Sequence, residues 1–319
     1  MRRLWALVMA FILLGGTGVN AMENVWKINI AGGEVVTATT FSPKGNRMVV
    51  GTSLGRLAIF DVSGANAKNW NVKPILDVKG VEKTLITALA FDGAQKILAI
   101  GSLDGNVKFT DNTGAVLKEF NFNSVIRQII FSDDNSRAMV LCDSNAVSII
   151  DINSYNISVF SYKYAHPRVV DFGATSNEIV EGFVSARGDI IKGNIDRNKA
   201  IVKLYAHDFG VDALTVNAAN NLLVSFGQDA LIKIWSLDSL QLMGQINVTD
   251  TFNSLILTAD ASTLIGKCMD GSIKIFDVVG CIQTDAIFPG SELNAIALKP
   301  DGKFVAAAYA NGDICVYAF

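Results

Sequence analysis

The sequence of 319 residues has few of the side chains on which metal and redox chemistry depend. It holds two histidines, His166 and His207, and four cysteines, none of them in a Cys-x-x-Cys pair. Two isolated histidines cannot supply the imidazoles of a multi-histidine copper site, and the cysteine spacing offers neither a redox pair nor a covalent haem attachment. We therefore predict that the protein binds no metal and needs no cofactor.

The chain also lacks a surplus of positive charge and, after residue 21, any apolar run long enough to span a membrane. Its formal net charge is −3. Nucleic-acid binding needs clustered basic residues, so we expect no nucleic-acid partner. No Gly-rich phosphate loop opens a helix, and Ser, His and Asp occur without a nucleophile motif. These absences predict a protein that is not an enzyme.

Residues 1–21 have the pattern of a cleavable secretory signal. Two arginines precede an apolar stretch, residues 4–14, and Val19 and Ala21 fit the −3 and −1 positions of a cleavage site. The stretch is shorter than the roughly 20 residues of a membrane span. We expect cleavage after Ala21, which leaves residues 22–319 as a monomeric periplasmic protein without a membrane anchor; a retained anchor is the alternative. Removing two arginines and no acid takes the net charge from −3 to −5.

The cysteines Cys142, Cys268, Cys281 and Cys315 allow two interpretations. An even number in an exported chain favours disulfides. Their separation along the chain favours buried free thiols instead, because Cys142 lies far from the others. We expect free thiols, with Cys281–Cys315 as the one pairing to be checked.

A large apolar residue followed by a polar turn recurs seven times, at spacings of 50, 40, 41, 44, 41 and 41 residues. A turn residue follows each anchor by fourteen positions, or by sixteen in the fourth repeat. Repeats of about 40–45 residues that each contain four short strands predict an all-β, seven-bladed propeller over residues 22–319. The anchors are Phe41, Phe91, Phe131, Phe172, Val216, Leu257 and Leu298, and the turn residues are Gly55, Gly105, Asn145, Gly188, Ala230, Gly271 and Gly312.

The two ends of the chain predict how the propeller closes. The seventh repeat stops after its third strand, residues 313–319, and a lone strand, residues 24–30, follows the signal. We expect this N-terminal strand to complete the last blade, which removes exposed sheet edges. Two irregularities are also expected. An insert at residues 63–70 carries Trp70, either exposed for contact or packed on its blade, and Gly193 favours a bulge in residues 189–194.

The repeat pattern resembles the WD40 repeat family over the whole mature chain. The fifth repeat matches best, and the family's internal hydrogen-bonding set falls there on His207, Ser225, Asp229 and Trp235. The resemblance implies that these four side chains are structural. The other repeats lack the histidine, so we expect most blades to rest on apolar packing. They hold Gly32, Glu82, Phe122, Lys163, Val248 and Pro289 at its position.

Seven polar residues, each four positions before an anchor, form the candidate binding site. Each stands where the innermost strand of its repeat begins, so in a propeller they converge at one mouth of the central channel. The resemblance implies that this face binds proteins. Arg127 and Arg168 fall on neighbouring blades, and we expect them to form a basic spot that suits a carboxylate. The seven are Thr37, Thr87, Arg127, Arg168, Asp212, Asn253 and Asn294.

Three functions follow from the resemblance. Size, signal and fold are similar to the exported WD40-like accessory proteins, the L subunits, of periplasmic nitrate reductase systems, which implies a scaffold that binds a reductase component or its maturation apparatus. An envelope-assembly scaffold is an alternative. The competing class is a lactonase-like, metal-dependent hydrolase, which Asp212, Asn253 and Asn294 on three consecutive repeats would suit.

Overall fold

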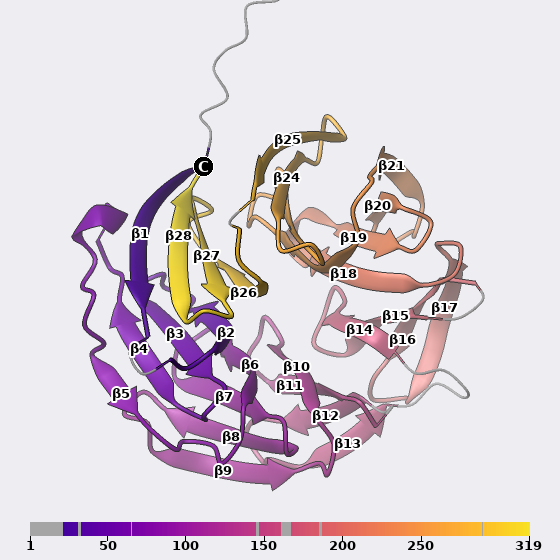
Figure 1. Ribbon diagram of the computed structural model, residues 1–319. Helices are drawn as coiled ribbons and strands as arrows, with labels where there is room; N and C mark the ends of the chain where they lie inside the picture. The colour runs from indigo at the N-terminus through magenta and orange to yellow at the C-terminus, as the bar shows by residue number, and fades with distance from the viewer. Residues whose placement is uncertain are drawn as a thin grey trace, which may run out of the picture.

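The computed structural model describes residues 22–30, 33–64, 66–144, 147–160, 167–184, 187–288 and 290–319. The signal predicted at residues 1–21, the turn residue Asn145 and the loop histidine His166 lie outside these residues. Seven four-stranded antiparallel sheets are arranged around a common axis (Figure 1). The prediction of an all-β, seven-bladed propeller is confirmed.

The first four blades follow the chain order, with the innermost strand first. Blade 1 comprises β2 (Val36–Phe41), β3 (Arg47–Thr52), β4 (Leu57–Asp61) and β5 (Leu76–Val78). Blade 2 comprises β6 (Ile86–Phe91), β7 (Ile97–Ser102), β8 (Asn106–Asp111) and β9 (Val116–Asn121). Blade 3 comprises β10 (Ile126–Phe131), β11 (Arg137–Cys142), β12 (Val147–Asp151) and β13 (Ile157–Phe160). Blade 4 comprises β14 (Pro167–Phe172), β15 (Glu178–Phe183), β16 (Asp189–Asn194) and β17 (Lys199–Tyr205).

The remaining blades complete the ring. Blade 5 comprises β18 (Val211–Asn217), β19 (Leu222–Gly227), β20 (Leu231–Ser236) and β21 (Leu242–Asn247). Blade 6 comprises β22 (Phe252–Leu257), β23 (Thr263–Cys268), β24 (Ile273–Asp277) and β25 (Ile282–Ile287). Blade 7 comprises β26 (Leu293–Leu298), β27 (Phe304–Tyr309), β28 (Asp313–Ala318) and β1 (Glu23–Asn29). Two single-turn 3₁₀ helices, η1 (Ala67–Asn69) and η2 (Ala218–Asn220), lie in the turns, and no helix of the described residues is both long and apolar enough to span a bilayer.

The N-terminal strand closes the ring as predicted. β1 is the outermost strand of blade 7 and pairs antiparallel with β28 from Glu23 opposite Ala318 to Asn29 opposite Asp313. Figure 1 shows the indigo strand beside the yellow one. Lys27 adds an ion pair, with Nζ 2.8 Å from the Asp313 carboxylate. Strands from the two ends of the chain thus share one sheet, and β1 covers the edge that β28 would otherwise expose.

Apolar side chains between neighbouring blades form the core, in seven clusters. Trp70 belongs to the cluster between blades 7 and 1, where its ring meets Trp26, Phe41 and Phe304 edge to face. Its indole N–H donates to the Gly64 carbonyl at 2.8 Å. The interpretation of Trp70 as an exposed contact residue is therefore wrong, because the insert folds back and buries the ring against its blade.

The smaller expectations on backbone and cysteines can also be compared with the structure. All four cysteines are free thiols, so Cys281 and Cys315 do not pair. The register between β16 and β17 shifts at Lys192 and Gly193, which confirms the bulge in blade 4. The hairpin residues Gly55, Gly105, Ala230, Gly271 and Gly312 all have positive φ, as tight turns between strands require. Gly188 does not have a positive φ. A side chain is excluded there for another reason, because a Cβ atom would lie only 2.7 Å from the His207 carbonyl oxygen.

Candidate functional site

The seven polar residues predicted to converge do so in space. We call the face where the innermost strands begin the top face and the opposite face the bottom face. At the top, all seven side chains line one cavity of about 460 Å³ on the propeller axis. Every blade contributes one of them: Thr37, Thr87, Arg127, Arg168, Asp212, Asn253 and Asn294. We refer to these seven residues as the ring.

A β-bulge at each ring residue explains why the side chains turn toward the channel. In every innermost strand the pairing register shifts across this position, for example between Val36 and Ala38 around Thr37. The same shift occurs in the other six blades. A bulge residue leaves the pleat, so its side chain no longer follows the alternation of the strand. The sequence spacing identified the positions but gave no signal of the bulges.

Part of the ring connects neighbouring blades. Asn294 Nδ2 donates to the Val36 carbonyl at 2.8 Å, which joins blade 7 to blade 1. The Thr37 hydroxyl donates to the Ile86 carbonyl at 2.6 Å, and Arg127 Nη2 donates to the Arg168 carbonyl at 3.0 Å. These bonds satisfy backbone groups that the bulges free from the ladder. The ring is therefore a structural element as well as a candidate surface.

The two ring arginines each have an acidic partner. Arg127 Nε lies 3.2 Å from Asp143 Oδ1, and Arg168 Nε lies 3.0 Å from Asp212 Oδ1. The side chain of Asp212 is 9% exposed, whereas that of Arg168 is 44% exposed. The expected free basic spot is consequently a pair of half-exposed ion pairs. A partner carboxylate would have to compete with Asp143 and Asp212.

Other polar groups of the cavity are less well satisfied. The Thr87 hydroxyl is buried without a hydrogen-bond partner among the described residues. Lys267, which the sequence reasoning missed, lies on the second strand of blade 6 and donates from Nζ to the Asn294 carbonyl at 2.7 Å. Burial lowers the pKa of Lys267. Lys267 is half-buried, and the charge of Glu292, which lines the adjoining groove, partly offsets the effect of burial on this pKa.

A groove continues from the cavity across the top face between blades 6 and 7. Its volume is about 700 Å³, and it shares Asn253, Lys267 and Asn294 with the cavity. Two large apolar side chains border it, Met269 with 68% and Phe288 with 70% of its surface exposed. The sequence signal for both was available: large apolar residues in predicted turns, where burial in the blade core is not expected.

Exposed apolar side chains on the two faces are unevenly distributed among the described residues. On the bottom face, three large apolar residues are exposed in the connections between strands: Val72, Ile75 and Val279. The top-face turns carry six. Apolar surface gathered on one face of a protein is a mark of an interaction site. The six top-face residues are Leu54, Leu103, Val184, Phe209, Met269 and Phe288.

The four residues assigned to the polar set of blade 5 form one continuous chain. Trp235 Nε1 donates to Ser225 Oγ at 2.9 Å, Ser225 lies 2.7 Å from His207 Nε2, and His207 Nδ1 lies 2.8 Å from Asp229 Oδ1. Because Asp229 only accepts, Nδ1 carries the proton and Nε2 accepts from Ser225. Burial lowers the pKa of His207, which favours the neutral form of its imidazole. All donors and acceptors are used, which leaves the histidine no role as a ligand.

Two other blades fill the same positions with carboxyl groups. In blade 2 Glu82 takes the place of His207; it is buried, and Lys108 Nζ lies 3.3 Å from it. In blade 4 Glu181 takes the place of Ser225, 1% exposed and with Oε2 unpaired in the described chain. Burial raises the pKa of Glu181 to about 8. Apolar packing alone therefore does not describe the blades that lack histidine.

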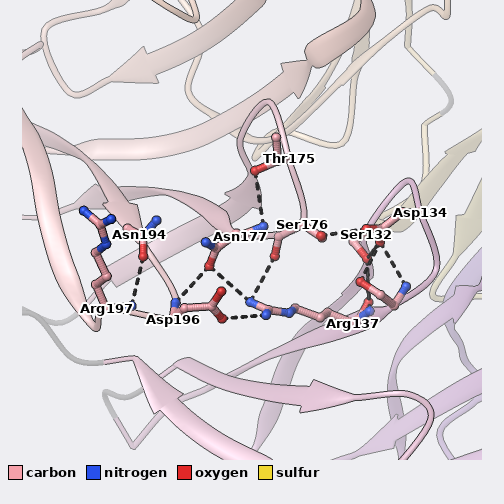
Figure 2. A network of polar contacts seen from close by, with 10 residues as sticks. Ser132, Asp134, Arg137, Thr175, Ser176, Asn177, Asn194, Asp196 and Arg197 are labelled. Atoms are coloured by element: carbon pink, nitrogen blue, oxygen red, sulfur yellow. Dashed lines mark hydrogen bonds and ion pairs between the residues drawn. The ribbon is translucent and has the colours of Figure 1, made fainter.

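A polar network on the bottom face connects blades 3 and 4 (Figure 2). Asp134 accepts hydrogen bonds from Ser132 at 2.7 Å within its own turn and from Ser176 at 2.7 Å in the next blade. Arg137 reaches Asp196 at 2.6 Å and the Ser176 carbonyl at 3.4 Å. The hydrogen bonds, that from Ser176 above all, hold the pKa of Asp134 far below its usual range.

Two of the three residues that suited a metal-dependent hydrolase are already engaged. Asp212 binds Arg168 and accepts from Gln228 at 3.4 Å, and Asn294 donates to the Val36 carbonyl. Within the described part of the chain, no group of three or more His, Cys, Asp and Glu side chains is placed to hold an ion. The ring geometry therefore gives this alternative no support.

Comparison with known proteins agrees with this architecture. The family model "WD domain, G-beta repeat" matches residues 198–236, which lie in blades 4 and 5 and include the complete polar set. The chain resembles the β-propeller domain of Cps50 (Swd1) from Myceliophteria thermophila with a TM-score of 0.79 at 14% identity. That likeness covers 93% of this chain and 99% of the other, and it concerns the fold alone.

Curated relatives are distant and longer. The U3 small nucleolar RNA-associated protein 15 homolog of Gallus gallus is 25% identical over 68% of this chain and 42% of its own length. The SIR4-interacting protein SIF2 of Saccharomyces cerevisiae is 21% identical over 83% of this chain and 54% of its own. WD repeat-containing protein 36 of Homo sapiens is 28% identical over 44% of this chain and 16% of its own. The chain spans about half or less of each relative. The repeat match, the strand plan and the polar set together support assignment to the WD40 repeat family of β-propellers.

Proposed function

We propose that this propeller is a non-catalytic scaffold that binds another protein on its top face. The observation that carries the proposal is the distribution of exposed apolar side chains, six in top-face turns against three below, with two of the six beside one groove. Protein interfaces combine an apolar centre with a polar rim. Met269 and Phe288 supply the apolar part beside the groove, and the ring supplies polar groups next to it.

The groove and the cavity together suit an extended partner segment. They are continuous through Asn253, Lys267 and Asn294, so one segment can occupy both. An apolar partner side chain would lie between Met269 and Phe288. An acidic group further along would approach Lys267 and compete with Asp212 for Arg168. Among the matched relatives, the yeast protein is described by its name as interacting with another protein, which is consistent with this role.

We further propose that the protein acts in the periplasm after removal of residues 1–21. The signal-like sequence, with Val19 and Ala21 at the cleavage positions, supports this location. The partner we propose is a component of periplasmic nitrate reductase or of its maturation apparatus. That choice rests on the similarity in size, signal and fold to the exported accessory proteins. An envelope-assembly scaffold would use the same top face with another partner.

Cross-linking in native periplasm, followed by affinity purification of the tagged protein and mass spectrometry, tests the proposal. We expect one stoichiometric partner, with cross-links on top-face residues. The matched control is a chain with Met269→Asp and Phe288→Ser, which should recover the partner poorly. Recovery of respiratory components would support the nitrate reductase assignment. Cross-links confined to the bottom face or the outer strands would overturn the proposed surface, and stoichiometric metal without a partner would favour an enzyme.

A further inference from the structure

The residue that follows the predicted cleavage site contacts the neighbouring blade. Met22 lies just before β1, the outermost strand of blade 7. Its main-chain nitrogen is 3.0 Å from Oδ2 of Asp285, which lies on β25, the outermost strand of blade 6. The other oxygen of Asp285 accepts a hydrogen bond from the Ala286 N–H at 2.7 Å. Both oxygens of this carboxylate are thus oriented, one of them toward Met22.

The Asp285 carboxylate has no cationic side chain as an ion-pair partner among the described residues. The residue is half-buried. In the unprocessed chain the Met22 nitrogen is an uncharged peptide N–H. A half-buried carboxylate is stabilised far better by a cation with good geometry than by a neutral donor. Hydrolysis of the bond before Met22 would create such a cation at this atom.

The Met22 side chain independently fixes this residue between the two blades. It packs against an apolar cluster to which blade 6 contributes Ile275 and blade 7 contributes Leu293 and Tyr317. At the predicted start of the mature chain, the side chain of Met22 therefore packs against an apolar cluster and its nitrogen has a hydrogen-bond acceptor. An unanchored terminus would have neither.

We propose that Met22 is the first residue of the mature protein and that its α-ammonium binds the Asp285 carboxylate. This inference rests on the export that is part of the proposed function. A signal peptidase adds one water across the Ala21–Met22 peptide bond, which leaves a carboxylate on Ala21 and, at neutral pH, an ammonium on Met22. The new charge pair joins blade 6 to blade 7 at their outer strands. Processing thereby tightens the junction next to the closing strand.

Two measurements test the proposal. The first is N-terminal sequencing and intact mass of the chain exported from its full-length precursor, where we expect a start at Met22. The second compares thermal unfolding of the mature chain with that of a chain carrying a neutral Ser-Gly extension before Met22, each with and without Asp285→Asn. The extension keeps a peptide N–H on Met22 and removes only the charge. Asp277→Asn is the matched control, because Asp277 lies in the same blade and also accepts from a backbone N–H, that of Val279 at 3.0 Å.

We expect Asp285→Asn to lower the melting temperature of the mature chain by about 2–4 °C and that of the extended chain by less than about 1 °C. The difference should vanish above about pH 9, where an α-amine loses its proton. Asp277→Asn should affect both chains alike. A mature terminus elsewhere, or an equal effect of Asp285→Asn on both chains, would overturn the proposal. Neither result bears on partner binding, which the cross-linking experiment decides separately.

Discussion

The top and bottom faces of the propeller are built from the same kinds of turn and differ in what their side chains contact. On the bottom face, Asp134, Arg137 and Ser176 are joined by hydrogen bonds that cross from blade 3 to blade 4. On the top face, the Thr87 hydroxyl has no hydrogen-bond partner among the described residues, and Met269 and Phe288 are exposed. A polar network that is satisfied within the chain contributes stability, whereas unsatisfied and apolar groups at a surface favour a partner. We infer that the network on the bottom face contributes mainly to stability and that the top face contributes mainly to binding.

The largest effect on stability is expected from two buried carboxyl groups in the interior. Their titration limits the pH range in which variants of the two faces can be compared. Burial raises the pKa of Glu181 to about 8 and that of Asp171 to about 7. Both folded values lie above the unfolded ones, so stability is complete below about pH 4 and falls as the pH rises toward 8, by up to about 1.4 kcal/mol per unit for each group. Glu181→Gln should remove one of the two contributions. Thermal unfolding from pH 5 to 9 checks this; identical slopes in parent and variant would contradict it.

The second prediction separates the faces by binding. Met269→Asp combined with Phe288→Ser should weaken the partner complex roughly 100-fold, because exposed apolar anchors at the centre of an interface carry most of its affinity. The melting temperature should change by less than about 2 °C, since both side chains are largely exposed. The matched control is Val279→Ser, which removes an equally exposed apolar residue from the bottom face. Affinity measured against the cross-linked partner decides; equal losses in the two variants would abolish the distinction.

Exchange of the ring arginines should have a smaller effect on binding and should also lower stability. Arg127→Glu with Arg168→Glu should weaken binding about tenfold by removing the charges that meet an acidic partner. Because the new carboxylate at 168 would face Asp212, we also expect the melting temperature to fall by a few degrees. Lys203→Glu is the control, an ion-paired and exposed reversal on the outer strand β17. Titration and thermal unfolding of the same samples check both effects; full binding by the double variant would exclude a role for the ring charges.

The smallest effect is expected on the bottom face. Arg137→Ala removes the contacts to Asp196, Asn177 and the Ser176 carbonyl. Their loss should cost about 1 kcal/mol, or about 2–4 °C in melting temperature, because the bridged groups remain accessible to water. Partner affinity should stay within twofold. A binding defect in this variant, with the fold intact, would show that the bottom face also takes part in recognition.

The repeat pattern was sufficient to predict the fold and the location of the ring. Anchors spaced by about 41 residues fix the start of every innermost strand, and the lone strand after residue 21, found as β1, fixes the closure. His207 and its three partners were likewise predictable, because a hydrogen-bonded set at fixed positions leaves a local signature.

Features that depend on contacts between blades were not predictable. Trp70 is buried by Trp26, 44 residues earlier in the chain and in the blade next to it. The acidic partner of Arg168, Asp212, lies on the next blade, whereas Asp143, the partner of Arg127, follows the strand that pairs with β10 in the same blade. Periodicity reports on which face a residue has within a strand, but not on what the neighbouring blade places opposite it.

The bulges also bear on how freely this ring can vary. A residue at a bulge is outside the ladder, so its side chain does not follow the alternation that fixes the faces of the other residues in the strand. Seven equivalent positions already hold Thr, Arg, Asp and Asn on one unchanged backbone plan. The bulge thus gives every blade one channel-facing position that accommodates side chains of different size and charge, and the bonds that some of them make between blades limit which exchanges leave the fold unchanged.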